Sequence, residues 1–132
     1  IDARHAPLLP TDDEALARWT VCSHGGTQPT ERELFTWAHE AQERGAGEIL
    51  FTSMNHDGTK SGYPCTTYAR LTASLHIPVI ASGGAGNAHH IAKVLNEGHA
   101  DAALAASIFH FGEITIPELK AQLRAEGFAV RG

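Results

Sequence analysis

Residues 45–58, with the sequence GAGEILFTSMNHDG, decide the fold class of this protein. The apolar run Ile49-Leu50-Phe51 follows glycines and leads into an Asn-His-Asp-Gly turn signal, which predicts a short buried strand over residues 47–54. A strand that is apolar without polar alternation is typical of a parallel sheet covered by helices. The pattern therefore favours an α/β fold.

Similar units of strand, loop and helix surround this stretch. We predict further strands at 78–82 and 101–107, and the tip of a first strand at Ile1-Asp2. Capping signals mark the predicted helices: a box at Thr30–Glu33 for a helix over 31–44, Asn87, a second box at Thr115–Glu118, and a weaker helix over 64–76. The units recur at intervals of about 24–30 residues, which is the period of βα repeats with parallel strands.

The length bounds how much of a barrel this chain can form. A closed (βα)₈ barrel takes roughly 250 residues, and the chain has 132. We therefore predict one domain, residues 1–132, that forms half of a TIM barrel with about four βα units and a truncated first strand. Residues 3–29 are expected to form a long loop with a small β excursion at Trp19–Cys22. Since the chain opens at Ile1-Asp2 without Met, we expect a piece of a longer protein or a trimmed one.

Composition excludes several classes of protein. The net charge of −5 and the lack of a basic run argue against nucleic acid or an anionic membrane as the main partner. No apolar stretch approaches the roughly 20 residues that cross a bilayer. Cys22 and Cys65 are too few for a disulfide framework or a zinc knuckle, so we expect a cytoplasmic protein. We expect no metal and no cofactor, because the adjacent His89 and His90 point apart on a helix and are better explained as solvated residues.

Glycines and a serine follow the predicted strands in positions that suit a phosphate. Gly83-Gly84 come after one strand, and Ala106-Ser107 end the next. In barrels, the loops after the strands converge at one rim, where glycines let backbone amides approach an anion and helix N-termini favour negative charge. A tight turn without a ligand is the alternative for the glycine pair.

Two carboxylates also lie at predicted strand ends. Asp2 and Asp57 would face a shared mouth, which suits general acid and base catalysis. Asp57 could equally be a turn residue of an Asp-Gly pair, and Asp2 could form a surface ion pair with Arg4. Glu48, at the opposite end of its strand, could form a buried ion pair.

Taken together, these stretches resemble the cyclase subunit of imidazole glycerol phosphate synthase, a (βα)₈ barrel of histidine biosynthesis. The resemblance rests on several ordered motifs, which are IDAR (1–4), Gly25-Gly26 with Pro29-Thr30, GAGEILFTSMNHDGTKSG (45–62), PVIASGGAG (78–86) and DAALAASIFHF (101–111). The sister sugar isomerase of the same pathway, which shares the barrel and its phosphate loops, fits the DGTKSG and AASIFHF stretches less well.

The resemblance implies a lyase that converts a bisphosphorylated aminoimidazole carboxamide ribonucleotide and ammonia to imidazole glycerol phosphate and aminoimidazole carboxamide ribonucleotide. It also implies a glutaminase partner, docked on the opposite face, whose ammonia travels through the barrel. By position, the resemblance assigns roles to seven residues: catalytic Asp2 and Asp57, phosphate donors Gly58, Gly84, Ala106 and Ser107, and Glu48 as a gate for ammonia.

The chain departs from the family pattern in its missing N-terminal half, which holds another catalytic aspartate and a second phosphate site. Thr27 and Gln28 stand where basic residues are expected, and His56 stands where arginine is usual. We therefore expect either a part of a cyclase that is active only with an N-terminal half-barrel, or a stand-alone phosphate-binding half-barrel that self-associates into a dimer.

Overall fold

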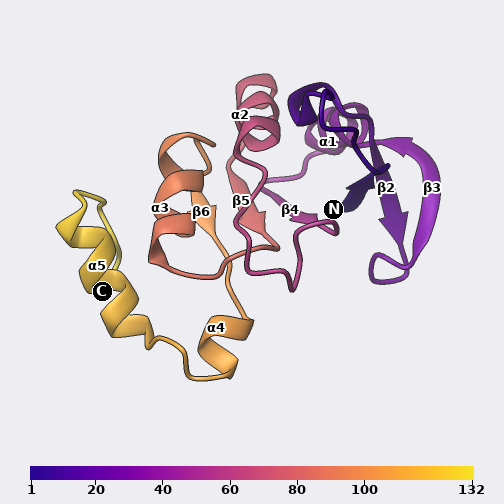
Figure 1. Cartoon of the computed structure of the whole chain (residues 1–132). Coiled ribbons are helices and arrows are strands. Elements are labelled where there is room, and N and C mark those ends of the chain that lie inside the picture. Colours follow the sequence, from indigo (N-terminus) through magenta and orange to yellow (C-terminus); the bar gives the residue numbers. More distant parts are fainter.

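The computed structural model describes residues 1–132 and contains six strands, five α-helices and one short 3-10 helix (Figure 1). The strands are β1 (Asp2–His5), β2 (Trp19–Ser23), β3 (Gln28–Glu33), β4 (Ile49–Ser53), β5 (Val79–Ser82) and β6 (Ala102–Ala103). The helices are η1 (Glu14–Leu16), α1 (Leu34–Glu43), α2 (Cys65–Ser74), α3 (Ala88–Asn96), α4 (Ser107–His110) and α5 (Ile116–Ala125). No helix is long and apolar enough to cross a membrane.

One sheet joins all six strands in the order β3-β2-β1-β4-β5-β6. The pairs β1–β4, β4–β5 and β5–β6 are parallel, and a helix follows each of β4, β5 and β6 in the chain. The predicted α/β fold is confirmed: the parallel strands and their helices form part of a TIM barrel. Figure 1 shows α1, α2 and α3 along one side of the sheet, with α5 at its far end.

The prediction of a long loop over residues 3–29 was correct only in part: the small β excursion expected at Trp19–Cys22 is confirmed as β2, but the segment around it is more ordered than predicted. β1 extends to His5, and β2 and β3 form an antiparallel hairpin beside it, with Cys22 opposite Asp2 and Trp19 opposite His5. Trp19 was expected in a minor excursion, yet its side chain is fully buried. The burial of this large apolar ring stabilises β2 against the sheet.

The capping box predicted at Thr30 was also wrong. Thr30 belongs to β3, and its hydroxyl donates to the carbonyl of Val21 at 2.8 Å, so it joins the hairpin. Glu33 is the residue that caps α1, because its carboxylate accepts from the amides of Phe35 and Thr36 at 3.0 and 2.9 Å. The helix thus begins at Leu34, three residues later than predicted.

The later boundaries follow the prediction more closely. Asn87 caps α3 by accepting from the amide of His90, and Thr115 and Glu118 form the predicted capping box of α5. The strand predicted over 101–107 is shorter, because only the two residues of β6 pair with β5. The extra helix α4 then begins at Ser107 and was not predicted.

The two faces of the parallel sheet differ in what covers them. Ala3, Phe51 and Ala81 point toward the helices and are fully buried. The opposite face is open: Leu50 remains 37% exposed in the middle of β4 and Leu104 42% exposed after β6. Since side chains alternate along a strand, this open face is the surface that would line the interior of a closed barrel.

Side chains on the open face form two rows across the strands. According to the strand register, the row nearer the strand starts contains Leu50, Ile80 and Ala102, and the row nearer the strand ends contains Asp2, Thr52 and Ser82. Layers of this kind, contributed by neighbouring strands, fill the interior of TIM barrels. Here the row at the rim is polar and the row below it is apolar.

Tyr68 of α2 joins the middle of β4 to the last residue of β5 from the helix side. Its ring is fully buried, and its hydroxyl lies 2.6 Å from the carbonyl of Phe51 and 3.1 Å from that of Ser82. The same hydroxyl accepts from the amide of Ser82 at 3.1 Å. Burial raises the pKa of Tyr68, so the hydroxyl stays protonated and donates to the strand carbonyls.

We predict that Tyr68→Phe lowers the free energy of unfolding by about 1–3 kcal/mol, because it leaves buried backbone groups of Phe51 and Ser82 without their partner. Tyr63→Phe is the matched control, since its hydroxyl makes a single bond to the carbonyl of Leu104 at a partly buried place. Urea denaturation of both variants measures the difference. An equal or smaller cost at Tyr68 would contradict this account.

Candidate functional site

A cavity of about 100 Å³ lies where the loops after β4, β5 and β6 meet. Its lining comes from three stretches, which are Asp57-Gly58, Ser82–Ala85 and Leu104–Ser107. The structure thus brings together Asp57 and the five residues Gly58, Gly83, Gly84, Ala106 and Ser107 that the sequence pointed to. Asp2 and Glu48 do not line this cavity.

The glycines of the cavity are required by close contact between two backbones. Gly84 has a φ of +123°, and a Cβ there would lie 2.1 Å from the carbonyl oxygen of Gly62. The amide of Gly62 in turn donates to the carbonyl of Gly84 at 2.8 Å. Gly83 has a φ of +86°, and its Cβ would lie 2.8 Å from the carbonyl oxygen of Ser53. The loop after β5 can therefore pack on the loop after β4 only without side chains.

His90 supports the glycine loop in a way that the sequence did not reveal. Its Nδ1 accepts from the amide of Gly86 at 3.0 Å, so this nitrogen carries no proton. Burial lowers the pKa of His90, and the nearby His89 and Lys93 lower it further. The expectation of a solvated His90 was wrong, because the half-buried ring holds the start of α3 against the loop.

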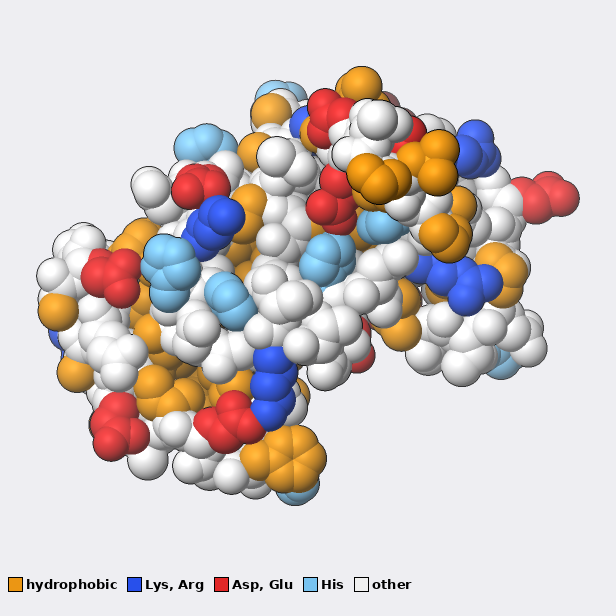
Figure 2. Space-filling model, viewed as in Figure 1, with side chains coloured by type: hydrophobic (Ala, Val, Ile, Leu, Met, Phe, Trp, Pro, Cys, Tyr) orange, Lys and Arg blue, Asp and Glu red, His pale blue; other side chains and the backbone are white.

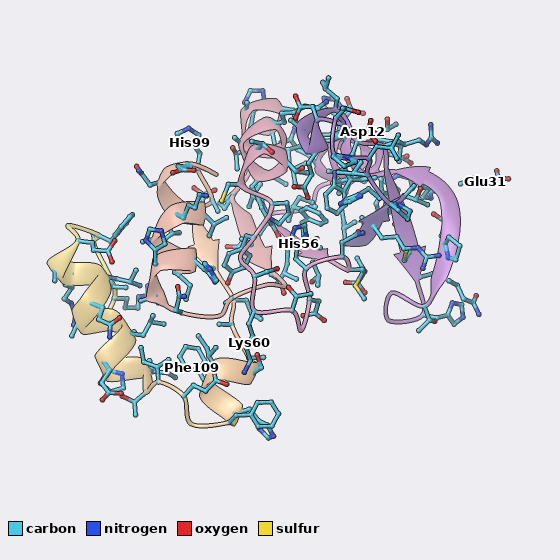
Figure 3. All side chains as sticks on the ribbon, viewed as in Figure 1. Asp12, Glu31, His56, Lys60, His99 and Phe109 are labelled. Carbon is cyan, nitrogen blue, oxygen red and sulfur yellow. The ribbon has the colours of Figure 1, made fainter.

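The cavity is lined by no cationic side chain. An anion placed there would depend on backbone amides, on the hydroxyl of Ser107, and on the first amides of α4, which have no acceptor within that helix. The nearby Lys60 forms an ion pair with Glu113, which joins the turn after β4 to the loop before α5 (Figure 3).

The two carboxylates occupy different surroundings. Asp57 is exposed on the turn after β4, and its amide donates to the carbonyl of Ser53 at 2.9 Å. Asp2 pairs with Thr52 in register on the open face of the sheet and forms no ion pair with Arg4, so that alternative was wrong. Both carboxylates therefore lie at the same edge of the sheet as the cavity, where β4 ends.

Glu48 lies at the other end of β4, directly before its first residue. It is exposed and forms no ion pair, so the alternative of a buried ion pair was wrong. No group of three or more His, Cys, Asp or Glu side chains is arranged to hold a metal ion.

Comparison with known proteins agrees with these features. Residues 1–115 match the sequence model of the family described as "Histidine biosynthesis protein". The relatives include proteins named imidazole glycerol phosphate synthase subunit HisF from Bacteroides fragilis, 59% identical over 113 residues, and Bacteroides thetaiotaomicron, 60% identical over 114. Another, from Elusimicrobium minutum, is 57% identical over 114 residues. The matches cover 86% of this chain but only 45–46% of these relatives, so the chain spans less than half of their length. The chain belongs to the histidine biosynthesis protein family.

Proposed function

We propose that this chain is the phosphate-binding half of a cytoplasmic cyclase of histidine biosynthesis. The reaction would convert a bisphosphorylated aminoimidazole carboxamide ribonucleotide and ammonia to imidazole glycerol phosphate and aminoimidazole carboxamide ribonucleotide. The observation that carries the proposal is the convergence of Gly58, Gly83-Gly84 and Ala106-Ser107 on one cavity at the strand ends. The relatives described above are imidazole glycerol phosphate synthase HisF subunits, which supports the proposal.

One phosphate of the substrate would occupy this cavity. Backbone amides at Gly58 and Gly84 can approach an anion closely, because glycine offers no Cβ in their way. The hydroxyl of Ser107 and the start of α4 would add donors on the other side. A site built this way binds a phosphate without a lining lysine or arginine, in keeping with the net charge of −5.

Asp2 and Asp57 would act as the acid and base residues of this half. Asp57 lines the cavity, and Asp2 belongs to the polar row of the open face, one strand away. A substrate whose phosphate sits in the cavity would extend across that row. The chemistry would also need a carboxylate from the N-terminal half, so we expect this chain alone to be inactive.

The open face of the sheet is where an N-terminal half-barrel would pack. The hairpin strand β2 already pairs with β1 from Asp2 to His5. A strand of the N-terminal half could therefore pair along this edge only with residues that precede Asp2 in the chain. At the other edge, β6 has a free side, and Figure 2 shows hydrophobic side chains gathered near α4 and α5. A glutaminase would dock at the end that carries Glu48, which would gate the entry of ammonia.

The alternative is a stand-alone half-barrel that binds phosphate and self-associates without cyclase activity. Leu50 and Leu104 are exposed on the open face of the sheet, and an exposed apolar face promotes association with another protein surface. A second copy could supply that cover instead of an N-terminal half.

Phosphate binding tests the cavity directly. We predict that Gly84→Ala and Ser107→Ala each weaken binding of inorganic phosphate at least several-fold in isothermal titration calorimetry. Gly84→Ala should also destabilise the fold by about 1–3 kcal/mol through its backbone conformation. Gly47→Ala is the matched control, because Gly47 has open space around it and no positive φ. Unchanged affinity in both cavity variants would rule out this phosphate site.

An assay of cyclase turnover distinguishes the half of a cyclase from the stand-alone phosphate-binding half-barrel. The chain should form imidazole glycerol phosphate from ammonia only when mixed with the N-terminal part of the Bacteroides fragilis relative, and Asp57→Asn should lower this rate by about 10²–10⁴. The controls are each part alone and Gly47→Ala. Activity of this chain alone would contradict the need for a second carboxylate, and a dimer that binds phosphate but stays inactive in the mixture would support the alternative.

A further inference from the structure

The ring of His90 contacts the two loops that follow β4 and β5, although it is not part of the cavity lining. Its Nδ1 accepts from the amide of Gly86, in the loop after β5, at 3.0 Å. A Cβ at Gly62, in the loop after β4, would lie 3.4 Å from Cδ2 of the same ring. One imidazole therefore touches both of the loops that supply glycines to the cavity.

The hydrogen bonds of His90 and Asn87 form a reciprocal pair at the start of α3. The side chain of Asn87 accepts from the amide of His90 at 2.9 Å, while the side chain of His90 reaches back to the amide of Gly86. This arrangement is similar to a capping box, in which glutamate or glutamine usually takes the place of the histidine. An imidazole can accept at Nδ1 only when that nitrogen carries no proton. The attachment of the loop therefore depends on the protonation state of one ring.

The two loops are in backbone contact at two places close to this ring. The amide of Gly62 donates to the carbonyl of Gly84 at 2.8 Å, and a Cβ at Gly86 would lie 2.3 Å from the carbonyl oxygen of Lys60. Gly58 and Gly84 line the cavity from opposite loops. If Gly86 loses its attachment, the loops can separate, and the backbone amides that face the cavity move apart.

The surroundings of His90 favour the neutral ring. Burial lowers its pKa, and His89 and Lys93 on the same helix lower it further. The start of a helix also disfavours a positive charge, because its free backbone amides carry partial positive charge. The neutral ring therefore contributes stability that is complete above about pH 6.5, the ordinary value for histidine, and that is lost as the pH falls through the lowered pKa.

Charged groups on the other elements around His90 do not offset this effect. No carboxylate forms an ion pair with its imidazole. Lys60, in the loop after β4, pairs with Glu113. Burial lowers the pKa of His56 in the same loop and raises the pKa of Cys65 at the start of α2, so both groups are uncharged near neutral pH. Protonation of His90 thus adds a cation that has no partner.

We propose that His90 is a positioning residue for the anion cavity: its neutral imidazole holds the loop after β5 against the loop after β4, and its protonation releases Gly86 and loosens the cavity. In the imidazolium, Nδ1 carries a proton, so two N–H donors face each other at Gly86. The role in anion binding rests on the proposed function, whereas the hydrogen bond to Gly86 does not. Anion affinity should therefore fall at acid pH, which is the opposite of what a histidine does when it binds an anion through its own charge.

Sulfate is the probe for this role, because its charge is constant between about pH 5 and 8, where histidine titrates. In isothermal titration calorimetry, the wild-type chain should bind sulfate several-fold more weakly at a pH below the lowered pKa of His90 than above about pH 6.5. His90→Asn keeps an acceptor at the position of Nδ1 but does not titrate. This variant should bind like the wild type at neutral pH and keep its affinity at acid pH.

Two further variants separate the acceptor from the ring and from the charge. His90→Phe keeps a ring without an acceptor and should bind sulfate several-fold more weakly than the wild type at neutral pH. His89→Asn is the matched control, because it removes the exposed imidazole next to His90 and should keep the loss of affinity at acid pH. An equal fall at acid pH in the wild type and His90→Asn, or a rise in the wild type relative to His90→Asn, would overturn the proposal and leave the phosphate cavity standing.

Nuclear magnetic resonance distinguishes a failure of this proposal from a failure of the proposed function. In the chain without added anion, the amide proton of Gly86 should shift with the same midpoint as the ring of His90, and it should stay constant in His90→Asn. A chain that shows this shift but binds no sulfate would contradict the proposed function and retain the pH-dependent attachment of the loop. A Gly86 resonance that does not change while His90 titrates would refute the attachment itself.

Discussion

The hydroxyl of Tyr68 links the middle of β4 to the last residue of β5, and the arrangement of the site depends on this link. It bonds to backbone groups of both strands from the helix side, so the two loops that follow leave the sheet from a fixed position. Those loops then meet backbone to backbone at Gly62 and Gly84. A parallel sheet offers few ways to fix the separation of neighbouring strand ends, and a buried tyrosine from the intervening helix does so with one atom.

The sequence predicted the repeating part of this structure well. The apolar runs around Phe51 and Val79 could be recognised as strands, and these strands bury one face against helices. Asn87 and Thr115 marked the starts of their helices, because each caps its helix through hydrogen bonds to neighbouring residues. These features depend on a few neighbouring residues. The residues that line the cavity at the strand ends were found for the same reason, since glycines and a serine directly after strands are visible in the sequence.

Features that depend on distant contacts were missed. The hairpin of β2 and β3 exists because Trp19 packs on Phe51 and Thr30 bonds to Val21, and neither contact is visible from local sequence. The supporting role of His90 likewise depends on how the loop after β5 folds back. Glu14 was unremarkable in the sequence, and its meeting with His5 and His56 depends on the path of the segment 6–18.

The two rows of side chains on the open face have a consequence for water. The rim row of Asp2, Thr52 and Ser82 can be hydrated, whereas the deeper row of Leu50, Ile80 and Ala102 offers no hydrogen bond. Any surface that closes over this sheet would therefore trap a wet layer above a dry one. A small neutral molecule would cross the dry layer more easily than an ion, because an ion would have to give up its hydration there.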